Sequence, residues 1–223
     1  ILVMQQKAES TAIAATEQNL EHEAKLMAGM LDSIYDSVKI RGENEAQFFR
    51  KYMGGQLEAG AGLVKTGDVE LPLVKLGNEV LNGQDRLLKS FRDLTNSDSA
   101  FLMVHNNKVY RLATLLKDKD GNSTQGTTLP GSNPEVRALL AGKPYTGVVK
   151  RAGKFYVSAI EPITDGNGKV VGALAARVNI QADMDRLMKA VAEIKSGSTG
   201  YAYILAPSAK VGDTEFIAHP TLS

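Results

Sequence analysis

The chain of 223 residues has no cysteine and no tryptophan. Without cysteine it cannot form disulfide bonds, thiolate-ligated zinc or iron–sulfur sites, or a thiol nucleophile. Its three histidines, His22, His105 and His219, are far apart in the sequence, which argues against a histidine-rich metal site. No apolar run approaches the ~18 residues that a membrane-spanning helix needs. These absences leave a globular chain of which 43% is apolar.

Catalytic patterns are also missing. Gly166, Gly168 and Gly172 are spaced almost like a dinucleotide-binding loop, but they lie between two predicted hairpin strands rather than between a strand and a helix. We find no activated nucleophile and no paired acid and base. The sequence therefore predicts a protein that is not an enzyme and that needs no cofactor and no metal.

The charge is nearly balanced overall but not locally. The formal net charge is +1, which gives no general attraction to nucleic acid, and no nucleic-acid partner is expected. Residues 101–160 hold nine Lys and Arg against three Asp and Glu, a local charge of +6, so the rest of the chain carries −5. Most of these lysines are interpreted as ordinary surface residues, and two of the cations need a further explanation.

The N-terminal segment predicts one long helix over residues 5–41, because it has no proline, a single glycine and many Ala, Glu, Gln, Leu and Met residues. A helix of this length exceeds the width of a small domain, so part of it should project or pair with another helix, and we expect a homodimer through it. Packing along its own domain is the alternative. The four apolar residues 1–4 are interpreted equally well as the end of a membrane anchor or as an ordinary helix start. Heptad spacing is seen at Leu20, Ala24, Met27, Leu31, Ile34 and Val38.

The rest of the chain predicts an α+β fold. Residues 42–76 appear irregular apart from a short strand at 69–74, and a helix follows at 82–94. Hairpin signals then separate five strands, which predicts an antiparallel sheet with a helical cover on one face. The expected domains are a helix and connector over 1–60, a sheet domain over 61–195 and a C-terminal hairpin over 196–223. The expected later elements are strands 100–105, 108–116, 145–151, 154–163 and 169–178, helices 134–140 and 180–194, and a hairpin of 201–206 with 215–219.

Two cations inside these strands are candidates for binding. Arg111 and Lys154 lie among aromatic and apolar residues, where a cation is costly unless it has a counter-ion or reaches water. A bound anion is one such partner; Glu161 or a solvent-facing orientation is the alternative. Strand alternation places Lys154 with Tyr156 and Ser158 on one face, whereas Arg111 and Thr114 converge only if their strand twists or bulges. This set offers charge-assisted hydrogen bonds to a small carboxylate.

Several segments carry a family likeness: 71–92, 110–114, 133–147, 153–156, 161–163 and 168–174, together with Gly200-Tyr201 and His219-Pro220. Together they resemble the Cache family, more narrowly the fused Cache variety found as the extracytoplasmic sensor of bacterial methyl-accepting chemotaxis receptors. The likeness implies a PAS-like sheet with a small-molecule pocket, in which Arg111, Thr114, Lys154 and Tyr156 correspond to pocket positions. With Tyr110, Ser158 and Tyr145 they form the predicted ligand-binding set.

The predicted function is therefore the periplasmic ligand-binding domain of a transmembrane chemoreceptor. Its expected ligand is a small anion such as acetate, pyruvate or another short-chain carboxylate, and its expected output is a helix displacement passed to the membrane. Membrane contact is expected only through flanking segments. The alternatives are a sensor domain of a histidine kinase or cyclase, and a dimerisation module that binds no ligand.

Overall fold

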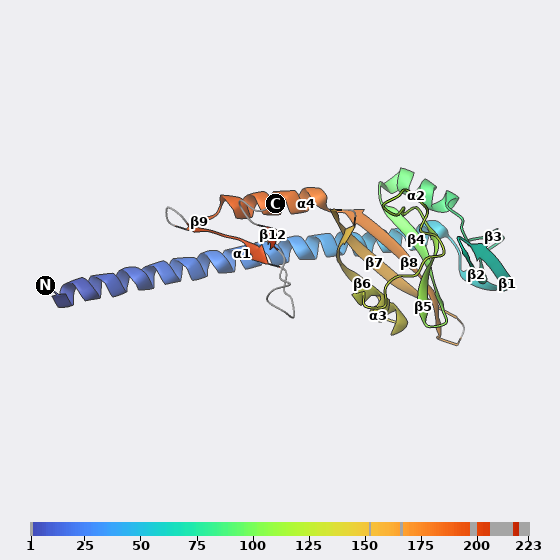
Figure 1. Ribbon diagram of the computed structural model, residues 1–223, viewed down its shortest axis with the longest axis horizontal. Coiled ribbons are helices and arrows are strands. Elements are labelled where there is room, and N and C mark those ends of the chain that lie inside the picture. The colour runs from blue at the N-terminus through green and yellow to red at the C-terminus, as the bar shows by residue number, and fades with distance from the viewer. Residues whose placement is uncertain (1, 152, 166, 197–199, 206–215, 219–223) are drawn as a thin grey trace. The chain divides into compact units, whose positions relative to one another are not determined.

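The computed structural model describes residues 2–151, 153–165, 167–196, 200–205 and 216–218. The chain forms two compact units, one of residues 1–37 with 181–223 and one of residues 38–180. Figure 1 shows the elements in chain order. They are α1 (Leu2–Met53), β1 (Leu57–Thr66), β2 (Val69–Leu76), β3 (Glu79–Val80), α2 (Arg86–Thr95), β4 (Asp98–His105), β5 (Lys108–Thr114), α3 (Pro134–Leu140), β6 (Tyr145–Arg151), β7 (Lys154–Thr164), β8 (Val170–Asn179), α4 (Gln181–Glu193), β9 (Lys195–Ser196), β10 (Gly200–Tyr201), β11 (Ile204–Leu205) and β12 (Phe216–Ala218).

The long N-terminal helix is confirmed, but its predicted end at residue 41 is wrong. Helix α1 continues to Met53 as one uninterrupted helix. Gly42 lies inside it, and a Cβ at this position would come within 2.9 Å of Val157 Cγ2. Glycine here permits a close approach of the helix to the sheet, which offsets its cost in a helix interior of about 1 kcal/mol.

The predicted five-stranded antiparallel sheet is confirmed, with the strand order β5-β4-β8-β7-β6. The turns that join its strands have the positive φ angles that their asparagine and glycine residues favour. Asn106 and Asn107 join β4 to β5 with φ angles of 48° and 57°, which asparagine tolerates better than most residues, and Gly153 has a φ of 77° between β6 and β7.

A second, smaller sheet was not predicted as such. Strands β1, β2 and β3 form an antiparallel sheet in that order. The expected short strand at 69–74 is confirmed as part of β2, but the glycine-rich segment that was expected to be irregular is β1. Glycines at a register shift between Ala59 and Leu63 explain why this strand lacks a regular strand pattern.

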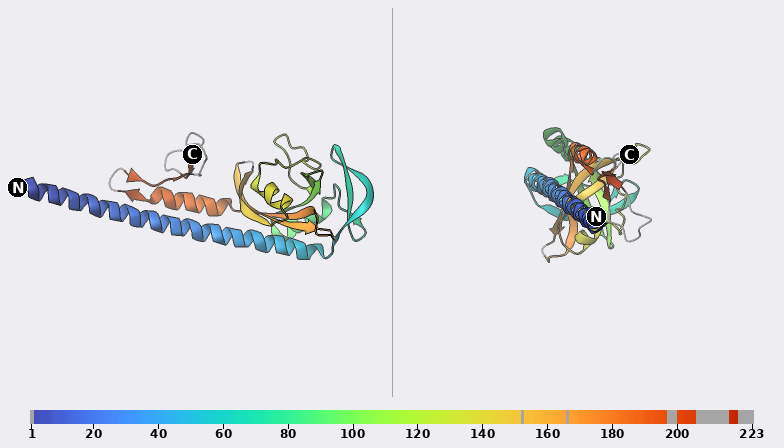
Figure 2. Two further views of the ribbon diagram at one scale, coloured as in Figure 1. Left: turned by 90° about the horizontal axis from the view of Figure 1, so that it is seen from below. Right: turned by 90° about the vertical axis from the view of Figure 1, so that its left-hand side faces the viewer.

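Helices cover both faces of the five-stranded sheet, so the expectation of a cover on one face is wrong. Helix α3 packs on one face through Val136 and Leu139, against residues of β4, β7 and β8. The C-terminal part of α1 and helix α2 pack on the other (Figure 2). We call the first the α3 face and the second the α1 face.

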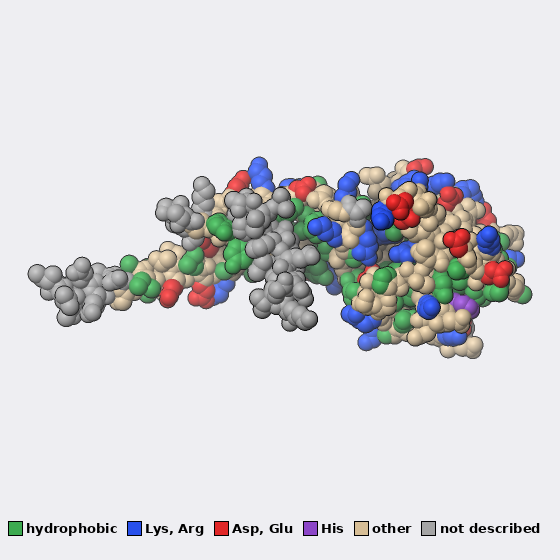
Figure 3. All heavy atoms as spheres, in the orientation of Figure 1, with side chains coloured by type: hydrophobic (Ala, Val, Ile, Leu, Met, Phe, Trp, Pro, Cys, Tyr) green, Lys and Arg blue, Asp and Glu red, His purple; other side chains and the backbone are tan. Residues whose placement is uncertain are grey.

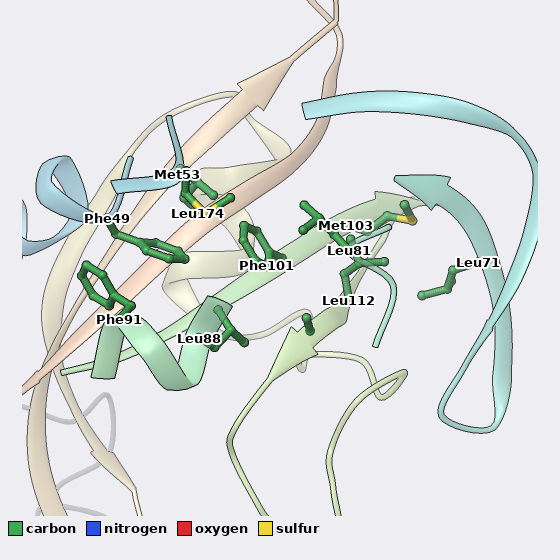
Figure 4. Packing of buried hydrophobic residues seen from close by; sticks show 11 residues of the cluster. Phe49, Met53, Leu71, Leu81, Leu88, Phe91, Phe101, Met103, Leu112 and Leu174 are labelled. Atoms are coloured by element: carbon green, nitrogen blue, oxygen red, sulfur yellow. The ribbon is translucent and has the colours of Figure 1, made fainter. Parts of the chain in front are cut away.

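The core of the α1 face is aromatic. Phe49 of α1 lies 4.7 Å from Phe91 of α2 and 5.5 Å from Phe101 of β4, measured between ring centroids. Figure 4 shows these rings with the aliphatic side chains around them. All three phenylalanines are fully buried. This core fixes the end of α1 and helix α2 on the sheet.

The unit that contains the N-terminal part of α1 is simpler. Helix α4, predicted over residues 180–194, buries Met184, Leu187 and Val191. The expected final hairpin is confirmed in part, since β11 pairs with β12 through Ile204 and Ala218. The expected start of that hairpin at residue 201 is wrong, because Tyr201 belongs to β10 and pairs with Lys195 of β9. Residues 206–215, His219 and Pro220 lie outside the described residues. Within the described part of the chain, the helices all fall short of the apolar length that crossing a bilayer requires.

Candidate functional site

A small cavity lies on the α3 face of the five-stranded sheet, with a volume of about 30 Å³. Strands β4, β5, β6, β7 and β8 all contribute to it, and α3 borders it through Glu135. One ordered water molecule needs roughly 10–15 Å³ of cavity volume, so the cavity has space for about two waters. Its lining residues are Ala100, Leu102, Arg111, Thr114, Leu116, Leu129, Glu135, Val149, Arg151, Ser158, Ile160, Ala175 and Arg177.

A β-bulge in β5 brings Arg111 and Thr114 into this cavity together. Phe101 pairs with Ala113 and Leu102 with Arg111, so Leu112 is the extra residue of β5. An inserted residue reverses the alternation of side chains beyond it. Arg111 and Thr114 therefore share the α3 face, which fulfils the condition that the sequence set for their convergence.

Three arginines surround the cavity: Arg111, Arg151 and Arg177. Burial lowers the pKa of the Arg111 guanidinium, and the charges of Arg177 and Arg151 lower it further, while Glu135 opposes them. Burial also lowers the pKa of Arg177, an effect that Asp98 opposes and Arg151 reinforces. Arginine stays protonated at neutral pH all the same, so these cations repel one another across the cavity.

Glu135 is the single carboxylate among the residues that line the cavity. It is only 4% exposed. Its Oε1 accepts hydrogen bonds from Arg151 Nη2 at 3.2 Å and from Asn133 Nδ2 at 3.0 Å. Asn133 stands at the N-cap of α3, but its side chain makes no cap hydrogen bond. One carboxylate against three guanidinium groups leaves the cavity lining with a formal charge of +2.

The loop between β5 and α3 is held by Arg111. Arg111 Nη1 donates to Thr127 Oγ1 at 2.7 Å and to the carbonyl oxygen of Thr128 at 3.0 Å. The backbone N–H of Arg111 donates to the carbonyl of Thr127, and that of Gly126 donates to the carbonyl of Arg111. The same guanidinium therefore contacts both the cavity and the loop beside it.

Comparison with family models identifies the domain. The model of the Cache 3/Cache 2 fusion domain matches residues 5–223. The chain belongs to this family. The resemblance inferred from the sequence is thus confirmed, and the family supports a ligand-binding sensor domain. A comparison with curated proteins gave no match.

Solved structures similar to this Cache domain are sensory domains of Campylobacter jejuni chemoreceptors. The ligand-binding domain of Tlp3 in complex with L-valine is 15% identical, with a TM-score of 0.37, over 80% of this chain and 66% of that one. The Tlp3 domain with isoleucine bound is 14% identical, with a TM-score of 0.37 and the same two coverages. The periplasmic sensory domain of Tlp1 is 11% identical, with a TM-score of 0.32, over 81% and 64%. The chain spans about two thirds of the length of these domains.

Three of the predicted binding residues line the cavity of the Cache domain: Arg111, Thr114 and Ser158. Thr114 and Ser158 are buried, with 3% and 6% of their surface exposed. Both offer hydroxyl groups next to the arginines. Their role in binding stays a prediction, but their convergence from β5 and β7 is a property of the fold.

The other predicted residues lie elsewhere. Lys154 is exposed and pairs with Arg151 at the β6–β7 turn, outside the cavity lining. Tyr156 lines a neighbouring hollow of about 250 Å³ that also contains Arg177. Tyr110 packs on the core of the α1 face, so the sheet separates it from the cavity. Tyr145 pairs with Ile160, a cavity residue, but its own side chain is outside the lining.

Sequence reasoning missed Arg151, Arg177 and Glu135 as site residues. Arg177 follows the rule that selected Arg111, because it is a cation within an apolar strand, and this signal could have found it. Glu161, which was considered as a counter-ion for the strand cations, instead forms an ion pair with Arg50 of α1, with 3.5 Å between Glu161 Oε2 and Arg50 Nε. Nothing in the sequence pairs Glu135 with Arg151, because that contact joins α3 to β6 across the sheet face.

Proposed function

We propose that this Cache domain is the ligand-binding sensor domain of a transmembrane chemoreceptor and that its cavity on the α3 face binds a small anion. The observation that carries the proposal is the charge of the cavity lining, three arginines against one carboxylate. A bound carboxylate would neutralise part of this charge. It would also accept charge-assisted hydrogen bonds, which are about twice as strong as neutral ones.

Among carboxylates, a short-chain one such as acetate or pyruvate departs least from the size of this cavity, although even acetate exceeds the space of about two waters and binding would require the cavity to widen. A volume of about 30 Å³ has no room for an aliphatic side chain unless the cavity opens. An α-amino acid, the class bound in the Tlp3 structures, would also need a partner for its ammonium group. Glu135 is the carboxylate within the lining, and it already accepts hydrogen bonds from Arg151 and Asn133. The cavity therefore fits an anion without an amine.

The proposed signal begins at Arg111. Its guanidinium donates to Thr127 and Thr128 of the loop between β5 and α3. A carboxylate in the cavity would compete for these N–H groups and shift the loop between two arrangements, which would bias two packings of α1 in a homodimer. The domain would lie in the periplasm as part of an inner-membrane receptor. A histidine kinase or cyclase would use the same input with another output module.

The proposed homodimer would use the N-terminal part of α1. Of the predicted heptad positions, Leu20 and Ala24 are exposed, Met27, Leu31 and Ile34 are half-buried, and Val38 is buried. The exposed apolar residues near the N-terminus, including Ile13 and Leu20, would be covered by the second copy. Analytical ultracentrifugation at several concentrations tests this, and a monomer at every concentration would contradict a dimer formed by this domain alone.

A thermal-shift screen tests the ligand proposal. Acetate, propionate, pyruvate and L-valine are compared on the wild type and on Arg111→Gln with Arg177→Gln. A ligand at 100 times its Kd stabilises the folded state by about 2.7 kcal/mol, and the double variant should lose this gain. Lys154→Gln is the matched control, since it removes an exposed cation outside the lining. No stabilisation by any carboxylate, or equal stabilisation of the double variant, would refute the proposal.

A further inference from the structure

A second cavity lies on the α1 face, between the small sheet and the five-stranded sheet. Its volume is about 140 Å³. Strands β1 and β2 form one wall, and strands β4, β5, β7 and β8 form the other. Its lining residues are Leu57, Glu58, Ala59, Pro72, Val74, Phe101, Leu102, Met103, Val104, Leu112, Ile163, Val171 and Gly172.

The chemistry of this cavity is the opposite of that of the anion site. Glu58 is the single charged residue in its lining, and it is exposed. The deeper wall consists of Phe101, Met103 and Leu112, each at most 5% exposed. Strand β4 lies between the two cavities: Ala100 lines only the anion site, Phe101 lines only this one, and Leu102 borders both. The side chains of Ala100 and Phe101 thus face an ionic cavity and an apolar one from opposite sides of the strand.

Strand irregularities coincide with both walls of the cavity. In the small sheet, the β1–β2 register shifts between Ala59 and Leu63. In the large sheet, the β7–β8 register shifts between Ile163 and Thr164. Such shifts bend a strand and leave space that a regular ladder would close. The wall itself is tightly packed at Gly172, where a Cβ would come within 2.4 Å of the Leu102 carbonyl oxygen.

The charges near the mouth give no preference for an ion. An adjacent polar hollow of about 480 Å³ shares Leu57 and Ile163 with the cavity and contains Arg50. Arg50 lies 3.5 Å from Glu161, so its charge is already compensated. The mouth therefore lacks the cationic excess found on the α3 face.

We propose that this cavity is a second ligand site, for a small uncharged aromatic or branched-alkyl molecule. An enclosed apolar cavity of about 150 Å³ binds benzene, and this cavity has a similar volume and an apolar deeper wall, with its opening at the exposed Glu58 and Ala59. The cavity would accept one such ring between Val74 of the small sheet and Phe101 of the large one. The domain would then bind two chemically unlike solutes on opposite faces of one sheet.

Benzene titration followed by methyl NMR tests this site. With ¹³C-labelled methyl groups, benzene should cause saturable shifts at Met103, Val74 and Ile163, and Val74→Phe should abolish them by filling the cavity. Val80→Phe is the matched control: Val80 is 39% exposed on β3, outside the lining, and this variant should keep the shifts. Absence of saturation in the wild type, or equal shifts in Val74→Phe, would overturn the proposal.

A second variant and a second ligand make the result unambiguous. If Val74→Phe fails to fold, Ala59→Phe fills the same cavity from its exposed rim and should likewise abolish the benzene shifts; retained shifts in this variant would count against the site. Acetate stabilisation should persist in the cavity-filled variant, because the anion site lies on the other face. Loss of benzene shifts with retained acetate stabilisation supports two separate sites, and loss of both together would overturn the claim that they are separate.

Discussion

Replacing Glu135 by glutamine should weaken the ligand-free domain and strengthen its response to anions. Glutamine keeps the shape of Glu135 and an oxygen that accepts from Asn133, but it removes the charge that pairs with Arg151 at 3.2 Å. A hydrogen bond to a charged group contributes about 1.5–3 kcal/mol, and its neutral counterpart about half of that. The variant also leaves the three arginines without a carboxylate among the residues that line the cavity. We expect a loss of about 1–3 kcal/mol in the free energy of unfolding.

Thermal unfolding followed by circular dichroism measures this loss. For a chain of this size each kcal/mol lowers Tm by about 2–4 °C, so Glu135→Gln should unfold about 2–12 °C below the wild type. Acetate should then raise the Tm of the variant by more than it raises that of the wild type, because the bound anion replaces the missing carboxylate. The two effects have opposite signs, which a general loss of packing would not produce.

Glu161→Gln is the matched control for this experiment. Glu161 is also partly buried and has an arginine neighbour, Arg50, but it lies outside the anion cavity. Its removal should cost less than about 1 kcal/mol and leave the acetate shift unchanged. An unchanged Tm of Glu135→Gln, or an acetate shift equal to or smaller than that of the wild type, would refute the electrostatic account of the cavity.

Three further predictions concern turns and core residues that do not line either cavity. Gly126→Ala should destabilise the domain by more than about 2 kcal/mol in urea unfolding, since a Cβ would lie 2.1 Å from the carbonyl oxygen of Thr66 at the end of β1. Gly121 has a similar positive φ but open space around it, so Gly121→Ala is the control and should cost only about 1 kcal/mol. Folding lowers the pKa of Asp118, chiefly through the hydrogen bond from the Asn122 backbone N–H. The ionised carboxylate therefore stabilises the folded turn at pH values above the ordinary pKa of 3.8, and this stabilisation is lost as the pH falls through the lowered pKa of the folded state. Asp118→Asn should therefore speed amide exchange of the 118–122 turn more at pH 6 than at pH 2, and equal effects at both would contradict this. Phe91→Ala should cost about 3–5 kcal/mol in the same urea assay, and less than 1 kcal/mol would disprove its place in the aromatic core.

Local signals in the sequence predicted the regular parts of the fold. Proline at the start of α3 and the turn residues around β6 placed both elements at the bounds that the structure has. The end of α1 was missed because Gly42 has the same sequence signal as a helix break, although here it serves close packing against Val157. Strand β1 was missed because its glycines lie at a shift in the β1–β2 pairing register, which interrupts the alternation of apolar and polar residues that predicts a strand.

The candidate site was harder to predict than the fold. Arg111 stood out because a cation in an apolar strand needs an explanation. Its convergence with Thr114 depended on a bulge whose presence the sequence permits but does not require. The contact of Glu135 with Arg151 joins elements that come together only when the sheet forms. Site geometry of this kind is a tertiary property, and periodicity reports only secondary structure.

The bulge at Leu112 also affects how this chain should be compared with its relatives. A relative with a regular strand at this place would have one residue fewer between the positions equivalent to Arg111 and Thr114. An ungapped alignment across it would then match the cavity arginine with a residue of the aromatic core, or the reverse. Ligand signatures transferred by motif spacing alone would therefore fail at this point. A one-residue gap at Leu112, set from strand pairing, keeps equivalent side chains on equivalent faces.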